Sequence, residues 1–334
     1  MLNSYLNNNF NLDSIFSSKI TQNFEEIVFK VFLFQYNNNL IYQSFSNFLN
    51  KKPTSIKKIE EIPFLPISLF KTQKILSTNK YEKYFISSGT TFKHKQSYHY
   101  VYSLKIYEKS FTTAFNLFYD NYLDYVWIAL LPNNTERPNS SLVYMINYFI
   151  KNSKHKESNF YLNNFQKAYE NILKCFNENK KVILFGVSYA LIDFAEKYTL
   201  PKYDNLIVME TGGMKGKRRE ILREELHEYL CKRFNTSVIH SEYGMTEILT
   251  QSYSKGNGLF YAPPWMKILI RNLTEPFDVN LYEQYGGINI IDLANIYSCS
   301  FIATDDLGIK FKDESFKVLG RIDFTDERGC NLLY

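Results

Sequence analysis

The chain has 334 residues, of which 45% are hydrophobic, so it can bury a sizeable core and is not an intrinsically disordered protein. The formal net charge is only +5, and the dispersed basic residues argue against a nucleic-acid-binding protein. The four cysteines lie far apart, without the spacing of a zinc site or the density of a disulfide framework. They predict a reducing, cytoplasmic environment.

No targeting or membrane-spanning segment is expected. The N-terminus "MLNSYLNNNFNLDSIFSSKI" lacks the basic start and apolar centre of a signal peptide. The uncharged runs "VILFGVSYALI" and "SSLVYMINYFI" are shorter than the ~20 residues that a transmembrane helix requires. We therefore expect a soluble protein with no membrane span.

Taken in chain order, the predicted elements begin with helices and change to alternating strands and helices. Residues 1–75 read as helical with loops, and "NFEEIVFKVFLFQYNN" has apolar positions at helical spacing. "YVWIALLP", "KVILFGVS" and "NLIVMETGG" have the composition of buried strands, each followed by turn residues and a helical pattern. The basic run "MKGKRRE" is expected to open the helix "KRREILREELHEYLCKRF" as a solvated face.

The pattern changes again after Tyr285. Four short strands are expected there: "GGINIIDL", "CSFIATDDL", "IKFKD" and "FKVLGRID". The sequence predicts an α/β fold with a largely parallel sheet flanked by helices and a small β-rich subdomain packed on this core. We expect one domain over 1–334, with a helical part at 1–75, the β-rich part at 285–323 and a tail at 324–334.

One polar stretch interrupts the apolar runs. "YFISSGTTFKHKQSYH" places hydroxyl and glycine residues directly after a short apolar run, with Lys93 and Lys95 just beyond. Hydroxyls, backbone N–H groups and ammonium groups are what a polyphosphate requires. The spacing fits neither a Walker loop nor a Rossmann fingerprint, so the stretch is a different nucleotide loop or an ordinary loop.

Three further segments carry polar residues at the ends of predicted strands. In "SEYGMTE", Thr246 is expected to cap a helix and Glu247 to lie in its first turn; there a hydroxyl can bind a phosphate oxygen and a carboxylate can hold Mg²⁺. In "IATDDLG", Asp306 can bind ribose hydroxyls, and in "VLGRIDF", Arg321 can pair with phosphate or ribose. Taken singly, Asp306 reads as a turn residue and Arg321 as a surface charge.

In this order, the segments resemble the motifs of the adenylate-forming superfamily of acyl- and aryl-CoA ligases. The family's "[ST]SGTTGxPK" is matched by residues 87–91 and by Lys95, with Phe92 and His94 replacing its Gly and Pro. Its "YGxTE" is matched in full by residues 243–247, its "TGDLG" by residues 304–308 with Asp305 in place of Gly, and its "GRxD" by residues 320–323. "LLPNNTERPNSSLVYM", "METGGMKGKRRE" and "RGCNLL" look closer still to the acyl-protein synthetases of bacterial luminescence operons (LuxE-type).

The resemblance implies that ATP, with Mg²⁺, adenylates a fatty or similar carboxylic acid. The acyl group would then pass to a thiol of an acceptor protein such as a reductase or carrier protein. The implied phosphate contacts are Thr90, Thr91 and Thr246, and Glu247 would hold Mg²⁺. The rest of the implied nucleotide site consists of Ser87, Ser88 and Gly89 in the phosphate loop, Gly212 and Gly213 shaping the adenine pocket, Tyr243 stacking on the base, Gly244, Asp306 on the ribose and Arg321 at the nucleotide edge.

One departure from the family concerns the C-terminal lid. Only 11 residues follow Asp323, so we expect the mobile lid domain and its catalytic lysine to be missing. Its task then falls to another base, for which Lys95 is the candidate, to a partner chain, or to no group at all.

The thiols and one histidine leave alternatives open. Cys330 near the end of the chain is either the acyl acceptor or a small buried side chain, whereas Cys175, Cys231 and Cys299 read as core residues. His99 either lines the acyl pocket or is structural. Two further functions remain open beside acyl-protein synthesis: an acyl- or aryl-CoA ligase that releases a soluble thioester, and a degenerate nucleotide-binding scaffold.

Overall fold

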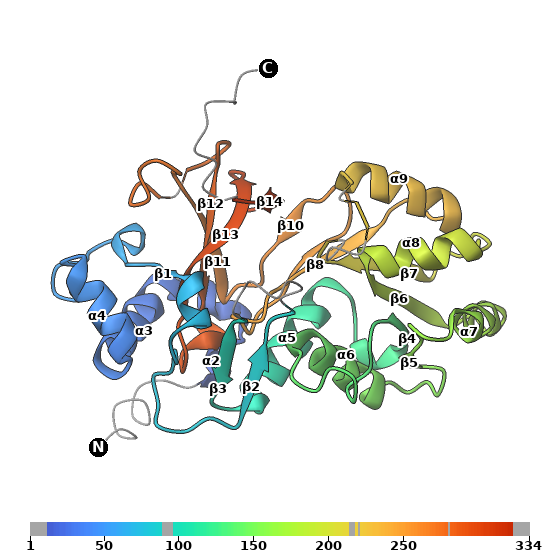
Figure 1. Ribbon diagram of the computed structural model, residues 1–334, viewed down its shortest axis with the longest axis horizontal. Helices are drawn as coiled ribbons and strands as arrows, with labels where there is room; N and C mark the ends of the chain where they lie inside the picture. Colours follow the sequence, from blue (N-terminus) through green and yellow to red (C-terminus); the bar gives the residue numbers. More distant parts are fainter. Residues whose placement is uncertain (1–11, 89–95, 214–217, 220, 280, 323–334) are drawn as a thin grey trace.

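The computed structural model describes residues 12–88, 96–213, 218–219, 221–279 and 281–322. Its described strands form one large mixed sheet of 12 strands and one two-stranded sheet, with helices packed around them (Figure 1). In the large sheet the strand order is β11-β12-β13-β14-β10-β9-β8-β7-β6-β4-β5, and β1 (Leu65–Pro66) pairs with β13. The predicted α/β class is confirmed.

Half of the large sheet is parallel. It contains β5 (Asn159–Phe160), β4 (Tyr125–Leu130), β6 (Lys181–Val187), β7 (Leu206–Thr211) and β8 (His240–Tyr243). The intervening helices are α6 (Ser141–Asn152), α7 (Phe165–Asn177), α8 (Ser188–Lys197) and α9 (Arg223–Phe234). Every residue of β4 is buried, as expected for a parallel strand covered on both faces. The strands predicted from "YVWIALLP", "KVILFGVS" and "NLIVMETGG" are therefore confirmed.

Helix α9 begins later than its basic pattern suggested. The predicted start at the run "MKGKRRE" is wrong for the described residues of that run, because the helix begins at Arg223. The Arg218 side chain instead binds two residues of α8. Its Nε donates to Asp193 at 2.9 Å, and its Nη2 pairs with Glu196 at 2.8 Å. These contacts replace the helical conformation that the charge pattern alone favours.

The other half of the large sheet is antiparallel. Its strands are β9 (Ser252–Ser254), β10 (Phe260–Tyr261), β11 (Met266–Arg271), β12 (Tyr285–Asp292), β13 (Phe301–Lys310) and β14 (Phe316–Arg321). "CSFIATDDL" and "IKFKD" were expected as two strands, but β13 runs through both, with a bulge between Leu307 and Gly308. Gly308 allows this because a Cβ there would lie 2.6 Å from the Lys317 carbonyl oxygen.

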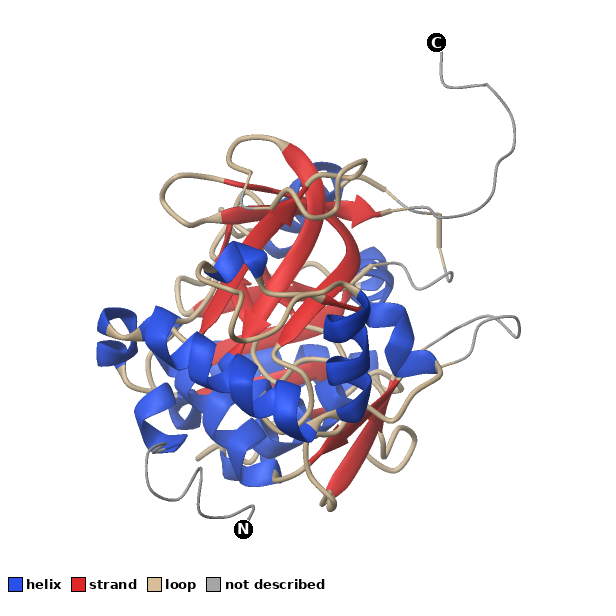
Figure 2. Cartoon of the chain, turned by 90° about the vertical axis from the view of Figure 1, so that its left-hand side faces the viewer, coloured by secondary structure: helices blue, strands red, loops and turns tan. Residues whose placement is uncertain are grey.

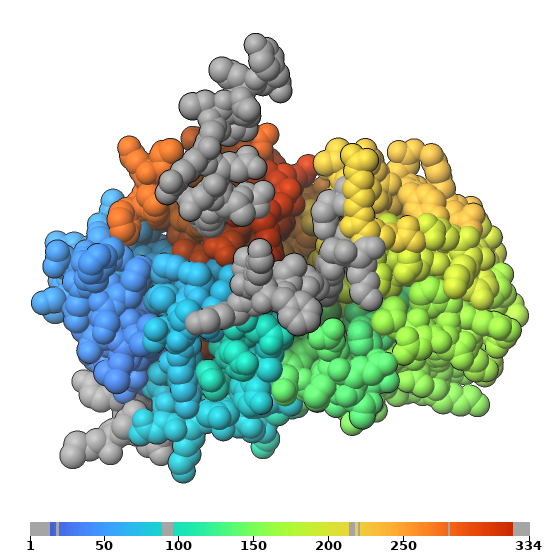
Figure 3. Space-filling view, viewed as in Figure 1, coloured from blue at the N-terminus to red at the C-terminus, as the bar shows by residue number. Residues whose placement is uncertain are grey.

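The N-terminal helices cover the antiparallel half. They are α2 (Leu12–Ile15), α3 (Phe24–Asn38) and α4 (Leu40–Phe48). The ring of Phe301 on β13 packs against Phe32 of α3 and Tyr42 of α4, with centroids 6.0 and 5.9 Å apart. Figure 2 shows helices beside the strands on this side of the molecule, and Figure 3 shows the blue N-terminal segment next to the orange and red C-terminal part of the chain.

Short 3₁₀ helices join several of these elements. They are η1 (Ser18–Gln22), η2 (Ile59–Glu61), η3 (Ile67–Lys71), η4 (Tyr122–Asp124) and η5 (Leu293–Asn295). Of these, η5 directly follows β12 and is buried.

A separate hairpin carries the polar stretch. Strands β2 (Lys83–Ile86) and β3 (Tyr98–Val101) pair antiparallel on either side of residues 87–97, and α5 (Leu104–Phe118) follows. Along β3 the side chains alternate: His99 and Val101 are buried, whereas Tyr98 is exposed. One face of the hairpin therefore packs on the rest of the molecule.

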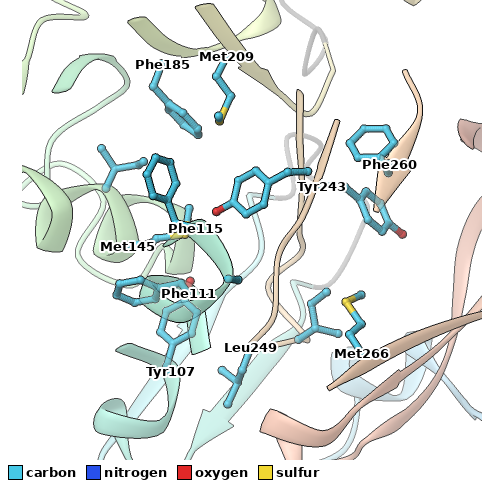
Figure 4. Close-up of a cluster of buried hydrophobic side chains, with 14 of the residues drawn as sticks. Tyr107, Phe111, Phe115, Met145, Phe185, Met209, Tyr243, Leu249, Phe260 and Met266 are labelled. Atoms are coloured by element: carbon cyan, nitrogen blue, oxygen red, sulfur yellow. The ribbon is translucent and has the colours of Figure 1, made fainter. Parts of the chain in front are cut away.

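The core between α5, α6 and the sheet is rich in aromatic rings. Trp127 of β4 stacks on Phe149 of α6 with centroids 4.6 Å apart and planes at 15°. Figure 4 shows Tyr107, Phe111 and Phe115 of α5 on one side of this region and Phe260 on the other. None of the helices in the described ranges has the length and hydropathy to cross a membrane.

Candidate functional site

The candidate site lies at the carboxyl ends of the parallel strands. Strands β6, β7 and β8 end at Val187, Thr211 and Tyr243. Strand β8 pairs parallel with β7 on one side and antiparallel with β9 on the other. Ligands of open α/β sheets commonly bind at the carboxyl edge where the topology changes. The motif residues Gly212, Gly213 and 243–247 follow directly from these strand ends.

Gly212 and Gly213 make the turn that follows β7. Their φ angles are +37° and +65°, and a Cβ atom on either residue would meet nothing within 4 Å. Backbone conformation rather than lack of space therefore favours glycine here. The predicted role in an adenine pocket stays a prediction.

Tyr243 joins two of the predicted motifs. Its hydroxyl donates to Asp306 Oδ2 at 2.8 Å, so the end of β8 is tied to the middle of β13. Its ring packs edge-on against Phe260 and Phe316, with centroid distances of 5.9 and 5.8 Å, and only 9% of the residue is exposed. Stacking on a base, which the resemblance implied, stays a prediction.

Asp306 is a partly shielded carboxylate beside an exposed cation. It faces Arg321 across β13 and β14, and Arg321 Nε lies 3.7 Å from Asp306 Oδ1. Burial raises the pKa of Asp306, while the Tyr243 hydroxyl and the Arg321 charge lower it. The Arg321 side chain is 84% exposed, so it can reach an anionic ligand above the carboxylate.

Thr246 and Glu247 lie in a turn and not at a helix start. The prediction that Thr246 caps a helix is wrong, because residues 244–251 form neither helix nor strand and the chain reverses into antiparallel β9. The turn is fixed from outside by side chains of other elements. Asp292 Oδ2, for example, accepts from the Leu249 N–H at 2.8 Å.

Glu247 is the most deeply placed of the predicted site carboxylates. It is 6% exposed, and burial raises its pKa. A hydrogen bond from Ser97 and the charge of Arg321 lower that pKa, whereas the charge of Asp306 raises it. A buried carboxylate next to a second carboxylate gains stability from an added cation, so its surroundings fit the predicted Mg²⁺ ligand.

Gly244 is needed for a close approach. A Cβ atom there would lie 2.6 Å from Oε1 of Glu242 and 3.4 Å from Cγ of Gln251. The Glu242 carboxylate also accepts from the Thr211 hydroxyl at 2.5 Å. The "YGMTE" glycine thus lets the turn pass over a buried polar cluster.

The polar stretch is closed at its base by Ser87. Its hydroxyl accepts from the Ser97 N–H at 2.9 Å, and its own N–H donates to the Ser97 carbonyl at 3.1 Å. The hydroxyl of Ser87 therefore shapes the loop, whereas Ser88 is exposed. The predicted residues Gly89, Thr90, Thr91, Lys95 and Cys330 lie outside the described residues.

The remaining thiols and His99 are structural. Burial raises the pKa of Cys175 to about 11 and of Cys299 to about 12, and burial also raises the pKa of Cys231 on α9. Such thiols are poor nucleophiles at neutral pH. Cys175 and Cys299 are buried, so their assignment to the core is confirmed, whereas Cys231 is only half-buried against the core, so its assignment is wrong. His99 is fully buried with both ring nitrogens in contact with oxygen atoms, as the structural alternative expected.

Arg271 is a site-related residue that the sequence pattern did not reveal. Its guanidinium is buried under β12 and β13, where it donates to the Thr304 carbonyl at 2.6 Å and to the Ile288 carbonyl at 3.0 Å. It lies close enough to lower the pKa of Asp306. A single arginine inside an apolar strand does not indicate in the sequence that its guanidinium lies beneath Asp306. The pair Gly286–Gly287 on the neighbouring strand is consistent with this position, because a Cβ on Gly287 would lie 2.4 Å from Cζ of Arg271.

No protein-family model and no curated protein sequence matches this chain. Its fold, however, is similar to solved ligases. An open conformation of 2-hydroxyisobutyryl-CoA ligase, in complex with 2-HIB-AMP and CoA, gives a TM-score of 0.64 at 10% identity, over 90% of this chain and 69% of the ligase chain. ATP-bound MatB from Rhodopseudomonas palustris gives 0.52 at 14% identity, over 74% of this chain and 48% of that chain.

The chain shares the fold of these two ligases over 90% and 74% of its length. This confirms the fold class expected from the order of the motifs, although the identities of 10% and 14% support the fold alone. The chain spans about half the length of MatB (48%). The activity, substrates and acceptor of a whole ligase therefore do not carry over to this chain.

Proposed function

We propose that this protein activates a carboxylic acid with ATP, forming an acyl adenylate and pyrophosphate. The observation that carries the proposal is the convergence of Tyr243, Glu247, Asp306 and Arg321, which come from three separate motifs. They meet at the carboxyl edge of a sheet, where α/β folds bind nucleotides. The neighbouring solved structures carry ATP in one case and an acyl-AMP in another.

Each residue has a role that suits its surroundings. Asp306 would accept hydrogen bonds from the ribose hydroxyls, and Arg321 would pair with phosphate. Thr246, together with the Ser/Thr loop, would donate to phosphate oxygens, and Gly212 and Gly213 would border the adenine. An oxygen of the substrate carboxylate attacks the α-phosphorus of ATP, the new P–O bond forms and pyrophosphate leaves. Fixed donors and positive charge around these anions supply most of the rate enhancement.

Glu247 is the residue that would hold Mg²⁺. This ion commonly takes one or two carboxylates together with phosphate oxygens, and it would neutralise the charge that develops on the phosphates. The low exposure of Glu247 and its neighbour Asp306 make a cation favourable there. Burial raises the pKa of Glu247, and the hydrogen bond from Ser97 acts in the opposite direction, toward the ionised form that binds a metal.

The acid-dependent exchange of labelled pyrophosphate into ATP tests this proposal. We expect wild-type protein to exchange with at least one acid of a fatty and aryl panel, and Glu247→Gln to exchange on the order of 10²-fold more slowly, as for loss of one electrostatic group. Glu157→Gln is the matched control, since Glu157 is also buried but pairs with Lys174 and Lys180, so its exchange rate should stay at the wild-type value. Equal rates for the two variants would contradict the site, and no exchange in wild type with any acid would favour the scaffold alternative.

The second half of the proposed reaction passes the acyl group to a protein thiol, as in the acyl-protein synthetases that the sequence resembles. The thiolate of Cys330 would attack the acyl carbon, forming a thioester and releasing AMP. This acceptor is supported by its "RGC" sequence context and by the raised thiol pKa of the three other cysteines. From there the acyl group would move to an acceptor protein such as a reductase or carrier.

Intact-mass spectrometry separates this route from a CoA ligase. After incubation with a long-chain fatty acid, ATP and Mg²⁺, we expect a hydroxylamine-labile acyl mass on wild type and on Cys231→Ala, and none on Cys330→Ala. Pyrophosphate exchange should be equal in all three. Label that persists in Cys330→Ala would place the acceptor elsewhere, and acyl-CoA formed on addition of CoA without any labelled protein would favour the CoA-ligase alternative.

A further inference from the structure

The turn that carries Thr246 and Glu247 is held by side chains from distant elements. Residues 244–251 lie between β8 and β9 without helix or strand, and the backbone bond from the Ile248 N–H to the Met245 carbonyl is long, at 3.5 Å. Residues 247–250 are nevertheless buried. A buried segment of this kind must satisfy its backbone polar groups with partners from elsewhere.

His99 of β3 supplies the first of these partners. The residue is fully buried, and its Nδ1 lies 2.7 Å from the Thr246 carbonyl oxygen. A carbonyl can only accept, so this contact is a hydrogen bond when Nδ1 carries the ring proton. The ring of Phe70 packs edge-on against the imidazole, with centroids 5.9 Å apart, and burial lowers the pKa of His99 to about 4.

Asn295 of η5 supplies the second partner for the backbone of the turn. Its Nδ2 donates to the Glu247 carbonyl and to the Cys299 carbonyl, both at 2.8 Å. These two bonds leave Oδ1 of the amide facing Nε2 of His99 at 2.9 Å. The Thr246 carbonyl and Asn295 Oδ1 both accept, so the neutral imidazole can donate to one of them and only the protonated ring to both. His99 and Asn295 are therefore in contact and hold the carbonyls of two successive residues of the turn.

Asp292 at the end of β12 holds the next part of the turn. Its Oδ2 accepts from the Leu249 N–H at 2.8 Å and its Oδ1 from the Thr250 hydroxyl at 2.6 Å. The positions 246, 247, 249 and 250 are thus each bound by a buried side chain from β3, β12 or η5. No single one of these elements could fix the turn alone.

Strand β3 also links this turn to the Ser/Thr loop. Ser97 directly precedes β3 and lies two residues before His99, and both residues are buried. Ser97 bonds the Glu247 carboxylate, and its N–H donates to the Ser87 hydroxyl at the base of the loop. A shift of β3 would therefore move the Ser87–Ser97 base of the loop and the Glu247 carboxylate together.

We propose that His99 and Asn295 are positioning residues that hold the Glu247 carboxylate in place for metal binding. They act on the carbonyls of Thr246 and Glu247 and do not touch the reacting groups. The inference rests on the proposed function, because it assigns Glu247 as the metal ligand. It predicts that losing either residue weakens the metal dependence of the reaction and not only the stability of the fold.

Two variants test it. His99→Phe keeps a ring against Phe70 and removes both polar contacts, and Asn295→Ala removes the amide. In pyrophosphate exchange we expect each to raise the half-saturating Mg²⁺ concentration by about 10-fold, as outer-sphere changes do at metal sites, and to slow exchange by up to about 10²-fold, as misplaced groups do. His99→Asn, whose amide can still donate toward the Thr246 carbonyl, should recover part of both.

Asn39→Ala is the matched control. Asn39 is 1% exposed, like Asn295, and donates to the Ser298 carbonyl at 3.0 Å, next to Cys299, without contacting the turn. We expect it to lower the thermal midpoint about as much as Asn295→Ala and to leave the Mg²⁺ dependence unchanged. Equal Mg²⁺ dependence in wild type, Asn295→Ala and His99→Phe would overturn the inference while leaving the proposed function intact.

Amide hydrogen exchange provides a readout that does not depend on activity. Peptides covering residues 244–251 should exchange faster in His99→Phe and Asn295→Ala than in Asn39→Ala, measured by mass spectrometry below the thermal midpoint of every variant. If wild type shows no pyrophosphate exchange, the proposed function fails, and this measurement alone decides whether the two residues hold the turn. Unchanged protection of 244–251 would then overturn the inference.

Discussion

At the scale of single residues, the contact between Tyr243 and Asp306 is the bond that joins the parallel and antiparallel halves at the candidate site. The Tyr243 hydroxyl donates to a carboxylate whose pKa is already raised by burial. Without that donor, Asp306 would lose a group that favours its ionised form. The pair therefore connects the geometry of the site with its protonation state.

Tyr243→Phe should destabilise the fold and narrow the pH range over which pyrophosphate exchange is fast. Losing a hydrogen bond to a charged group costs about 1.5–3 kcal/mol. Because the pKa of Asp306 rises further, more of it is protonated as the pH falls, and the acid limb of the exchange rate should move to higher pH. Urea unfolding and exchange rates between pH 5.5 and 8 measure the two effects. An acid limb that stays at its wild-type pH would argue against Asp306 as a nucleotide ligand.

A substitution at Gly287 tests whether the buried Arg271 guanidinium supports the strand that carries Asp306. A Cβ at this position would lie 2.4 Å from Cζ of Arg271, so Gly287→Ala must displace the guanidinium from the Thr304 carbonyl. We expect a loss of about 1–3 kcal/mol of unfolding free energy, typical of overpacking. In a double-mutant cycle with Arg271→Met, the cost of the alanine should shrink, because the obstructing group is gone. Additive costs would show that the guanidinium is not the obstacle.

At the scale of elements, α6 is held against the parallel half by aromatic packing. Phe149 stacks on Trp127 of β4 and lies edge-on to Phe111 of α5, with centroids 5.2 Å apart. The ring thus joins two helices to one strand. Because α5 follows directly on the β2–β3 hairpin, this packing also supports the hairpin that carries the Ser/Thr loop.

Phe149→Ala should cost about 3–5 kcal/mol, the usual range for removing a large buried ring. Phe48 at the end of α4 is the matched control, since it is 83% exposed, and Phe48→Ala should change stability by less than about 0.5 kcal/mol. Urea unfolding followed by tryptophan fluorescence measures both, with Trp127 beside the mutated ring. Similar costs for the two variants would contradict the packing of α6 on β4.

At the scale of the whole molecule, buried histidines link stability to pH. Burial and the charge of Lys255 lower the pKa of His240 to about 4, and its Nδ1 lies 3.0 Å from the Tyr119 hydroxyl. The folded state therefore favours the neutral ring. Its contribution is fully present above the unfolded pKa of about 6.5 and is lost as the pH falls toward 4.

His240→Gln should remove this part of the acid sensitivity. Relative to the variant, we expect wild type to lose about 2–3 kcal/mol of unfolding free energy between pH 7 and pH 4, by proton linkage. The comparison cancels the opposite effect of Asp292, whose pKa burial raises to about 6 and which is present in both proteins. Urea unfolding at pH 7, 5.5 and 4.5 checks the sign, and a constant difference across this range would contradict it.

Local patterns in the sequence were sufficient for the long parallel strands β4, β6 and β7 and for the order of the motifs, but not for β5, β9, β10 and β11. Uninterrupted apolar runs such as 125–130, bounded by turn residues and too short for a typical helix, predict strands buried on both faces. Residue chemistry at the predicted strand ends indicated Thr246, Glu247, Asp306 and Arg321, whereas Tyr243 and the glycines were named from the resemblance to the ligase motifs. The structure brings Tyr243, Asp306 and Arg321 together.

The tertiary structure alone decided how the turn at 244–251 is held. "YGMTE" followed by apolar residues favours a helix locally. In the structure this segment is instead a turn, whose backbone groups contact the side chains of His99, Asp292 and Asn295. Asn295 lies 48 residues from Glu247 in the sequence, and neither residue has a neighbour that indicates the contact. The same holds for Arg271 beneath Asp306. Such hydrogen bonds depend on where the sheet brings distant strands, and no local pattern of residues contains that information.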